Sequence, residues 1–271
     1  MRITVYGLGI IGASVCAALK RAGHTVSGRN RSREPLDYAL KNGMIDDVAI
    51  DYKGAEVVVL ALPPRIVMRE LEEGSFPDGA VVTDICGVKS PIEKAVFSKP
   101  RNYRYVGAHP MAGKETSGIG SASVTLFDGK NLVLTRCAQT DSAAFETIKR
   151  LGADMGFGRI VECSAEKHDE MIALTSQLAH VVSNAYVKSP LTEDCAGFTG
   201  GSFQDMTRIA GVDETIWSEL FFLNRERLSA EIGRLIDSLQ QYVDVLENGN
   251  EADMRALLRE GKDFQSRFLR K

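Results

Sequence analysis

Short apolar runs alternate with helical patterns over residues 1–163 of the chain. The runs are rich in valine and isoleucine, which is typical of strands buried on both faces of a parallel sheet. Apolar residues recur at helical spacing in the segments between them. This alternation predicts an α/β fold with a Rossmann-type doubly wound sheet, in which ligands bind at the carboxyl ends of the strands. The predicted strands cover residues 3–6, 25–27, 56–62, 80–85, 105–109, 132–135 and 159–162, and the helices between them include residues 33–42, 65–73, 90–97 and 141–155.

The pattern becomes helical throughout after Cys163. Strand signals end there, so we expect a second, all-α domain over residues 164–271. All-α second domains of this kind often form dimers by exchanging helices, and we therefore expect a homodimer through this domain. Helical periodicity covers residues 165–188, 213–248 and 251–268, and a segment rich in glycine and threonine, residues 190–212, interrupts it.

Three glycines separate the first predicted strand from an alanine-rich helical pattern that continues to Gly23. A GxGxxG motif in this position is typical of dinucleotide binding, because the glycines permit a tight turn, close approach of a pyrophosphate and close helix packing. The N–H groups and dipole of the helix N-terminus then favour the phosphates. We therefore assign residues 1–163 as a dinucleotide-binding domain, and residues 164–271 as a helical domain for substrate binding and dimerisation. The residues expected to contact the cofactor here are Gly7, Gly9, Ile11, Gly12, Leu62 and Pro63.

The residues that follow the second predicted strand favour NADP over NAD. A fold that selects NAD usually has an acidic residue here, which binds the ribose hydroxyls. In this chain the strand is followed by Arg29, Asn30, Arg31 and Ser32, and the first acid is Glu34. Guanidinium groups bind phosphate through two parallel hydrogen bonds, so these residues suit the 2′-phosphate of NADP. The alternatives are a basic loop that only faces solvent, and NAD with Glu34 as the ribose ligand.

One histidine stands where this fold places reactants. His109 ends the predicted strand 105–109, and Pro110 biases it toward an extended backbone that aims its ring out of the sheet. This position at the carboxyl end of a strand favours a catalytic imidazole over a histidine that caps a buried strand edge.

A second histidine and an arginine have two interpretations each. His180 shares a predicted helix face with Ser176 and Gln177, and this face forms either a ligand-binding wall or a satisfied part of the core. Arg208 follows a glycine-rich turn and either binds a substrate carboxylate or forms a salt bridge with a nearby acid. Spacing alone leaves both questions open.

Composition and charge narrow the class of protein. The 271 residues are 44% hydrophobic and 25% charged, and the net charge of −3 argues against binding nucleic acid or an anionic membrane. No apolar run is long enough to span a bilayer, and the chain starts with a strand pattern rather than a signal peptide. The five cysteines are scattered without a CxxC pair, so we expect reduced thiols in the cytoplasm. The four histidines lack metal-ligand spacing, so no metal is expected.

Five segments together resemble the prephenate/arogenate dehydrogenase family: GLGIIG, TDICGVKSPIEK, VGAHPMAGKETSG, LTSQLAHVVSNA and GGSFQDMTRIAGVDETIW. They keep the family's order and extend from the first strand to about Asn224. HPMAG-x-E-x-SG combined with GG-x-F-x-D-x-TRIA is a specific pairing. The resemblance implies oxidative decarboxylation of prephenate to 4-hydroxyphenylpyruvate in tyrosine biosynthesis, with hydride transfer from ring carbon C4 to NAD(P).

The resemblance also implies roles for individual residues. His109 is expected to hydrogen-bond the 4-hydroxyl of the substrate and take its proton, which requires a neutral imidazole. His180 and Arg208 are expected to bind the two substrate carboxylates. Glu115 resembles a gating or substrate-positioning acid, and Lys114 stands in the same loop where the family often has a small polar residue, which can alter substrate selectivity.

One position departs from the family pattern. Family members commonly carry a serine just before Val88, where it assists the catalytic histidine, but this chain has Gly87. Ser90, Ser117 or water could replace the missing hydroxyl. Trp217 matches an aromatic residue next to the family's site.

Three alternatives stay open. Arogenate carries an ammonium where prephenate carries a ketone, and Glu115, the obvious carboxylate to face an ammonium, matches an acid that prephenate users also have; we therefore expect prephenate. A β-hydroxyacid dehydrogenase or imine reductase would share the architecture, but the hydroxyacid type needs a lysine inside the helix 165–188, where Lys167 and Lys188 stand only at the ends. A nucleotide sensor would need neither His109 nor Arg208.

Overall fold

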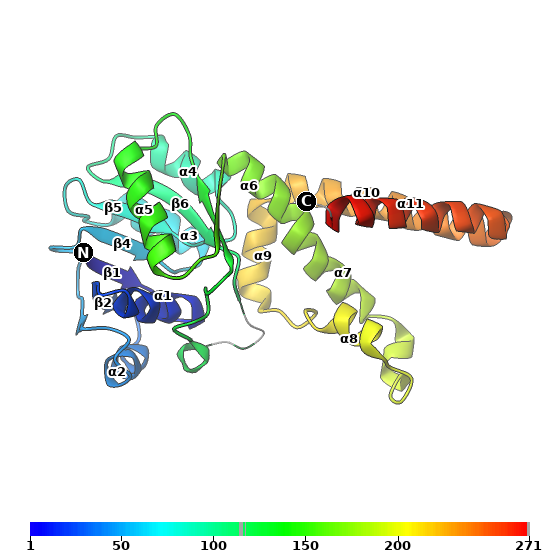
Figure 1. Ribbon diagram of the computed structural model, residues 1–271, viewed down its shortest axis with the longest axis horizontal. Helices are drawn as coiled ribbons and strands as arrows, with labels where there is room; N and C mark the ends of the chain where they lie inside the picture. The colour runs from blue at the N-terminus through cyan, green and yellow to red at the C-terminus, as the bar shows by residue number, and fades with distance from the viewer. Residues whose placement is uncertain (114–115, 117, 270–271) are drawn as a thin grey trace. The chain divides into compact units, whose positions relative to one another are not determined.

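The computed structural model describes residues 1–113, 116 and 118–269, which form two compact units, Met1–Asn224 and Arg225–Lys271. The first unit contains an eight-stranded sheet in the order β3-β2-β1-β4-β5-β6-β7-β8 (Figure 1). All of the predicted strands are present. The strands are β1 (Arg2–Tyr6), β2 (Thr25–Arg29), β3 (Asp47–Val48), β4 (Val57–Leu60), β5 (Val81–Asp84), β6 (Arg104–Pro110), β7 (Asn131–Thr135) and β8 (Arg159–Cys163).

Strands β1–β6 are parallel to one another, whereas β7 pairs antiparallel with β6 and parallel with β8. The expectation of parallel strands is therefore wrong at β7 and β8, which both run opposite to the others, and the reason lies in the connection between β6 and β7. A parallel pair needs a crossover element, usually a helix. Between β6 and β7 the described residues contain only one 3-10 turn, Ile119–Ser121, so the chain returns antiparallel. The sequence pattern also missed β3, which is only two residues long.

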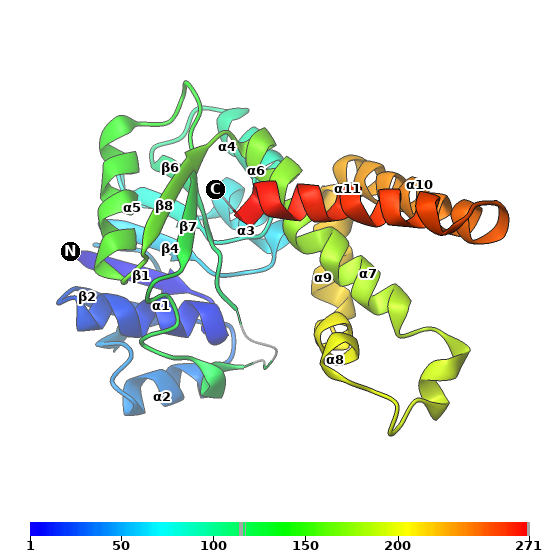
Figure 2. The same cartoon turned by 45° about the vertical axis from the view of Figure 1, so that its right-hand side comes forward.

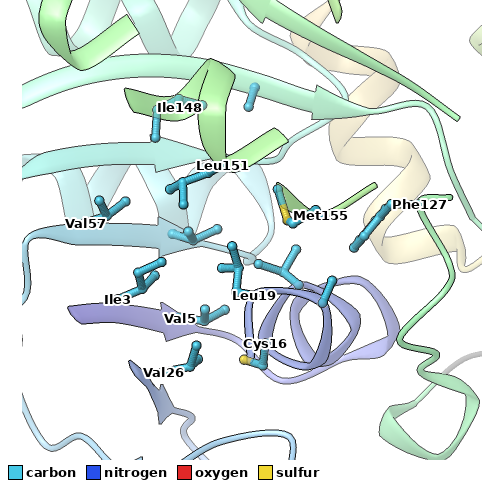
Figure 3. Close-up of a cluster of buried hydrophobic side chains, with 14 of the residues drawn as sticks. Ile3, Val5, Cys16, Leu19, Val26, Val57, Phe127, Ile148, Leu151 and Met155 are labelled. Atoms are coloured by element: carbon cyan, nitrogen blue, oxygen red, sulfur yellow. The ribbon is translucent and has the colours of Figure 1, made fainter. Parts of the chain in front are cut away.

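Helices cover both faces of the sheet and bury alternate side chains of its strands. Helices α1 (Ile10–Arg21) and α5 (Ser142–Asp154) pack on one face, and α3 (Pro64–Glu73) and α4 (Ser90–Phe97) pack on the other. Helix α2 (Arg33–Lys41) adds to the first layer through Leu36 and Ala39. Figure 3 shows the first of these cores, where Ile3, Val5 and Val57 of the strands meet Cys16, Leu19, Ile148 and Leu151 of the helices.

The segment predicted as one long helix over residues 165–188 is continuous but changes its winding. Helix α6 (Ala165–Ile172) passes into a π-helical segment, Ala173–Leu178, and then into α7 (Ala179–Tyr186) (Figure 2). Single π turns inside α-helices are frequent at functional sites. The Ser164 hydroxyl caps α6 by accepting the N–H of Lys167 at 3.2 Å.

The helix predicted over residues 213–248 is instead two helices that meet at Asn224. Helix α9 (Glu214–Leu223) ends there because the Asn224 side chain is buried and donates to the carbonyl of Asp169 and to the side chain of Gln177, each at 2.8 Å. The interrupting segment contains a 3-10 turn, Pro190–Asp194, and α8 (Gly201–Thr207).

The second unit consists of helices α10 (Arg225–Asn248) and α11 (Glu251–Leu269). The helices after residue 163 are therefore divided between the two units, and a domain boundary at residue 163 stays a prediction. Both helices expose apolar side chains at helical spacing, as a face that packs on another surface would. These side chains are Ile236, Leu239, Val243 and Leu246 on α10 and Leu258, Phe264 and Phe268 on α11. No helix among the described residues has the length and apolar character needed to cross a membrane.

Candidate active site

The glycine loop between β1 and α1 has the geometry that a bound dinucleotide requires. Gly7 has a φ of 100° and lies so close to the β4–α3 connection that a Cβ would be 2.1 Å from the Ala61 carbonyl oxygen. A Cβ on Gly12 would lie 1.9 Å from the carbonyl oxygen of Gly7. Around Gly9, by contrast, no described atom outside Gly9 and its two chain neighbours lies within 4 Å of the Cβ position, which leaves the first turn of α1 accessible. This cradle fits a pyrophosphate at a helix N-terminus.

The other expected cofactor residues lie around this loop. Ile11 is in the first turn of α1, and Leu62 lies beside Gly7 at the end of β4. Pro63 is the N-cap of α3. The side-chain oxygen of Asn30 accepts the N–H of Leu8 at 3.1 Å, so Asn30 holds the glycine loop to the end of β2.

The basic residues after β2 differ in their surroundings. The Arg29 guanidinium donates to Glu70 of α3 at 3.1 Å and lies over the rings of Tyr6 and Tyr52, 4.5 and 4.8 Å from their centroids. Arg31 and Ser32 are exposed immediately before α2. The sequence alone does not distinguish Arg29 from Arg31, because Glu70, the partner of Arg29, lies 41 residues further along the chain.

His109 lies at the same edge of the sheet as the glycine loop. Strands β1, β4, β5 and β6 are parallel, so their carboxyl ends, and the residues that follow them, share one edge. The point where a Cβ on Gly87 would lie is 3.7 Å from Cε1 and 3.8 Å from Nε2 of His109. This edge of the imidazole therefore faces Gly87, and Leu220 of α9 lies 3.6 Å from the same point.

The other ring nitrogen of His109 contacts a residue that sequence analysis did not single out. His109 Nδ1 lies 2.9 Å from Nε2 of His168, and His168 Nδ1 lies 2.7 Å from Oδ1 of Asp169. Both residues are on α6 and are buried, with 2% and 0% of their surface exposed. The sequence does contain a signal for His168 and Asp169. With Ala165 and Ile172 they recur at the spacing of a core-facing stripe of a helix, and these four residues are the buried positions of α6.

Burial keeps these imidazoles neutral. Desolvation, with further contributions from His168 and Lys89, holds the pKa of His109 well below its ordinary value of 6.5. Desolvation also lowers the pKa of His168, against an opposing hydrogen bond to Asp169. Burial acts to raise the pKa of Asp169, but hydrogen bonds from His168 and Ser90 outweigh it and the pKa is lowered. The site thus presents a neutral imidazole supported by an ionised carboxylate.

A buried ion pair, Lys89–Asp84, lies next to this carboxylate. Lys89 Nζ donates to Asp84 at 2.5 Å, and the Tyr105 hydroxyl donates to the other oxygen of Asp84 at 2.5 Å. The backbone N–H of Lys89 donates to Asp169 at 2.8 Å. Lys89 and Asp84 are fully buried, so these residues fix the segment after β5 that carries Gly87.

His180 and Arg208 lie close to each other along the helical part of the same unit. His180 Nδ1 donates to the carbonyl of Ile209 at 3.0 Å, and the His180 ring packs on Trp217 with centroids 3.8 Å apart. Arg208 is exposed at the end of α8, one residue before that carbonyl. Burial lowers the pKa of His180, and the bond to Ile209 partly offsets the effect. Trp217 and Leu220 are three residues apart on α9, so one face of this helix contacts His180 and also lies beside Gly87 and His109.

Three residues of the expected site lie outside the described residues, namely Lys114, Glu115 and Ser117. Ser90, another candidate to replace the family serine, donates its backbone N–H to Asp169 at 2.8 Å. A surface hollow of about 400 Å³, lined by Phe97, Lys99 and Arg101 among others, lies at the amino end of β6, the edge opposite His109.

Comparison with known proteins assigns these features to one family. The family model for the prephenate dehydrogenase nucleotide-binding domain matches residues 15–162, and that for the prephenate dehydrogenase dimerization domain matches residues 164–260. The chain is 31% identical to the prephenate dehydrogenase of Bacillus subtilis over 265 residues, which cover 89% of this chain and 70% of that protein. It is 29% identical to the cyclohexadienyl dehydrogenase of Zymomonas mobilis over 254 residues, 88% of this chain and 86% of that protein.

A solved structure shares the fold over nearly the whole chain. The prephenate dehydrogenase of Aquifex aeolicus, in complex with hydroxyphenyl propionate and NAD⁺, superposes with a TM-score of 0.87 at 27% identity. The match covers 99% of this chain and 98% of that one.

Alanine substitutions at the second and third glycines of the loop, Gly9 and Gly12, should have different effects. Gly9→Ala should fold as the wild type does and raise the dinucleotide Kd by at least about tenfold, because its methyl group occupies the space open to the phosphates. Gly12→Ala should lower the stability by about 1–3 kcal/mol or more, because its methyl group overlaps the Gly7 carbonyl. Thermal unfolding and dinucleotide titration measure the two effects. Unchanged affinity in Gly9→Ala, or unchanged stability in Gly12→Ala, would contradict this geometry.

Proposed function

Because this chain belongs to the prephenate/arogenate dehydrogenase family of NAD(P)-dependent enzymes, we propose that it converts prephenate to 4-hydroxyphenylpyruvate in tyrosine biosynthesis. The observation that carries the proposal is the position of His109, a neutral imidazole at the sheet edge that also carries the glycine loop. A general base must be unprotonated and within reach of the proton it takes.

In the proposed reaction His109 accepts the proton of the substrate's 4-hydroxyl as the C4–H bond breaks. The nicotinamide, when bound, supplies the acceptor for the hydride from C4. The bond between the ring and its carboxylate then breaks, its electron pair restores the aromatic ring as a phenolate, and CO₂ leaves. The protonated His109 returns the proton to the phenolate oxygen, which gives the phenol and regenerates the neutral base. Protein groups thus need to orient the substrate, exclude water and hold one proton, and no metal takes part in these steps.

We assign substrate anchoring to His180 and Arg208, in line with the family resemblance. The Nδ1 proton of His180 is committed to the Ile209 carbonyl, so Nε2 is the atom available to a ligand. Arg208 precedes that carbonyl directly, and a guanidinium fork suits a carboxylate. Glu115 and Lys114 remain the proposed residues for the substrate side chain, and arogenate remains the second candidate substrate, supported by the cyclohexadienyl dehydrogenase among the relatives.

We assign the cofactor preference to NADP, with the 2′-phosphate bound by Arg31 and Ser32. Both are exposed at the N-terminus of α2, where the helix dipole adds to the attraction for an anion. Arg29 contributes less directly, since Glu70 already pairs with its guanidinium. Asn30 supports the loop through its bond to Leu8. We also propose a homodimer through the helical region, supported by the match to the dimerization domain and by the exposed apolar faces of α10 and α11.

Replacing the base tests the reaction. We expect wild-type enzyme to turn over prephenate with release of CO₂ and 4-hydroxyphenylpyruvate, and His109→Asn to lower kcat by about 10²- to 10⁴-fold, the usual contribution of general base catalysis. Dinucleotide Kd is the control and should stay unchanged. Near-normal kcat in His109→Asn removes the residue from the mechanism, and turnover of arogenate alone shows that arogenate is the substrate.

Replacing one arginine tests the cofactor assignment. We expect the wild type to prefer NADP, and Arg31→Ala to lower kcat/KM for NADP by about 10- to 100-fold, because a charge-assisted bond to phosphate contributes about 1.5–3 kcal/mol. The kcat/KM for NAD should change little in Arg31→Ala.

Arg33→Ala is the matched control, since it removes the same positive charge from a neighbouring position. The Arg33 guanidinium pairs with Asp37 at 2.8 Å, so the loss in kcat/KM for NADP should be smaller. A wild-type preference for NAD, or equal losses in the two variants, would contradict the assignment.

A further inference from the structure

The tautomer of His109 follows from the hydrogen bonds behind it. Asp169 accepts the backbone N–H of Lys89 and the imidazole of His168 on Oδ1, and the backbone N–H of Ser90 on Oδ2, at 2.7 to 2.8 Å. An ionised carboxylate only accepts hydrogen bonds, so His168 Nδ1 must carry the proton in this contact. In the neutral ring Nε2 of His168 then has a lone pair.

The same reasoning continues to His109. Its Nδ1 lies 2.9 Å from the lone pair on His168 Nε2, so Nδ1 of His109 must donate. The remaining nitrogen, Nε2, is left unprotonated. It belongs to the ring edge that faces Gly87 and Leu220, away from His168.

We propose that His168 and Asp169 are positioning residues that hold His109 in the tautomer with a free Nε2, in the place of the family serine that Gly87 lacks. The proposal rests on the proposed function for the identity of the reaction, but the tautomer itself exists without substrate. The serine position lies beside Cε1 and Nε2 of the ring, whereas His168 holds the ring from Nδ1. Orientation therefore does not need a side chain at position 87.

The contacts around His168 and Asp169 hold the ring of His109 rigidly. Asp169 is tied to the N-terminus of α4 through Lys89 and Ser90, and its carbonyl accepts the side chain of Asn224 at 2.8 Å. His168 lies on α6, across from the strand that carries His109, with the two ring centroids 5.1 Å apart. A ring held at one nitrogen by a buried, fully bonded partner cannot rotate without breaking that bond.

Two substitutions at position 168 separate the hydrogen bond from packing. Asparagine can place an amide N–H near Asp169 but is too short to reach His109, whereas the glutamine oxygen can take the place of Nε2 as an acceptor. We expect His168→Asn to lower kcat by about 10- to 100-fold, with KM for prephenate and Kd for dinucleotide within about threefold of wild type, because it changes orientation rather than binding. His168→Gln should recover much of the loss. Lys167→Gln, an exposed change on the same helix, is the matched control and should leave kcat unchanged.

Nitrogen-15 NMR of the imidazoles provides a readout that does not depend on turnover. The chain has four histidines, so signals can be assigned with one variant each. We expect wild-type His109 protonated on Nδ1 and bare on Nε2, and a shift toward the Nε2-protonated form in His168→Asn. In the His109→Asn background, His168→Asn should cause no further loss of kcat, since it acts through His109.

Several results would overturn the proposal: wild-type His109 protonated on Nε2, a folded His168→Asn enzyme with the wild-type kcat, or a His168→Gln enzyme no faster than His168→Asn. If His168→Asn does not fold, the wild-type spectrum and His168→Gln still decide the question. If neither prephenate nor arogenate is turned over, the proposed function fails while the spectrum still tests the tautomer.

Discussion

A buried carboxylate, that of Asp169, connects the sheet to the helices that follow it. It is fully buried, and an ionised group in that position is stable only where hydrogen bonds replace the water it has lost. Two backbone N–H groups at the start of α4 and the imidazole of His168 provide those bonds. Leaving a buried group without one of its hydrogen-bond partners typically costs about 1–3 kcal/mol, and more when the group is charged, so the arrangement of α4, α6 and His109 depends on this one anion.

The buried ion pair of Lys89 and Asp84 connects the Asp169 network to the edge of the sheet. Lys89 takes part in both networks, through its backbone to Asp169 and through its ammonium to Asp84. The segment between them carries Gly87, which is therefore held beside the imidazole of His109. The carboxyl edge of the sheet thus brings together a glycine loop that fits a dinucleotide and a neutral imidazole that can accept a proton.

Local patterns in the sequence were sufficient for the features that depend on neighbouring residues. The glycine loop, the seven longer strands and the strand-end position of His109 follow from periodicity and from residues close in the chain. The antiparallel β7 was also accessible, since no helical pattern separates it from β6. What the sequence could not provide depends on distant partners: His168 contacts His109 across 59 residues, Arg29 pairs with Glu70 across 41, and Asn224 ends α9 through Asp169, 55 residues away. Single-sequence patterns carry no information on such pairs.

The pH dependence of kcat/KM for prephenate tests most directly whether a neutral His109 accepts the substrate's proton, because this ratio reports the ionisation of the free enzyme. Burial lowers the pKa of His109, of His168 and of His180 below the ordinary value of 6.5. At pH 6.5 each imidazole is therefore still mostly neutral, and His109, whose pKa lies well below 6.5, is neutral throughout the range from neutrality to 6.5. Any decrease in kcat/KM on acidification should therefore have its midpoint below pH 6.5. A decrease in kcat/KM with its midpoint at or above pH 6.5 would contradict the account.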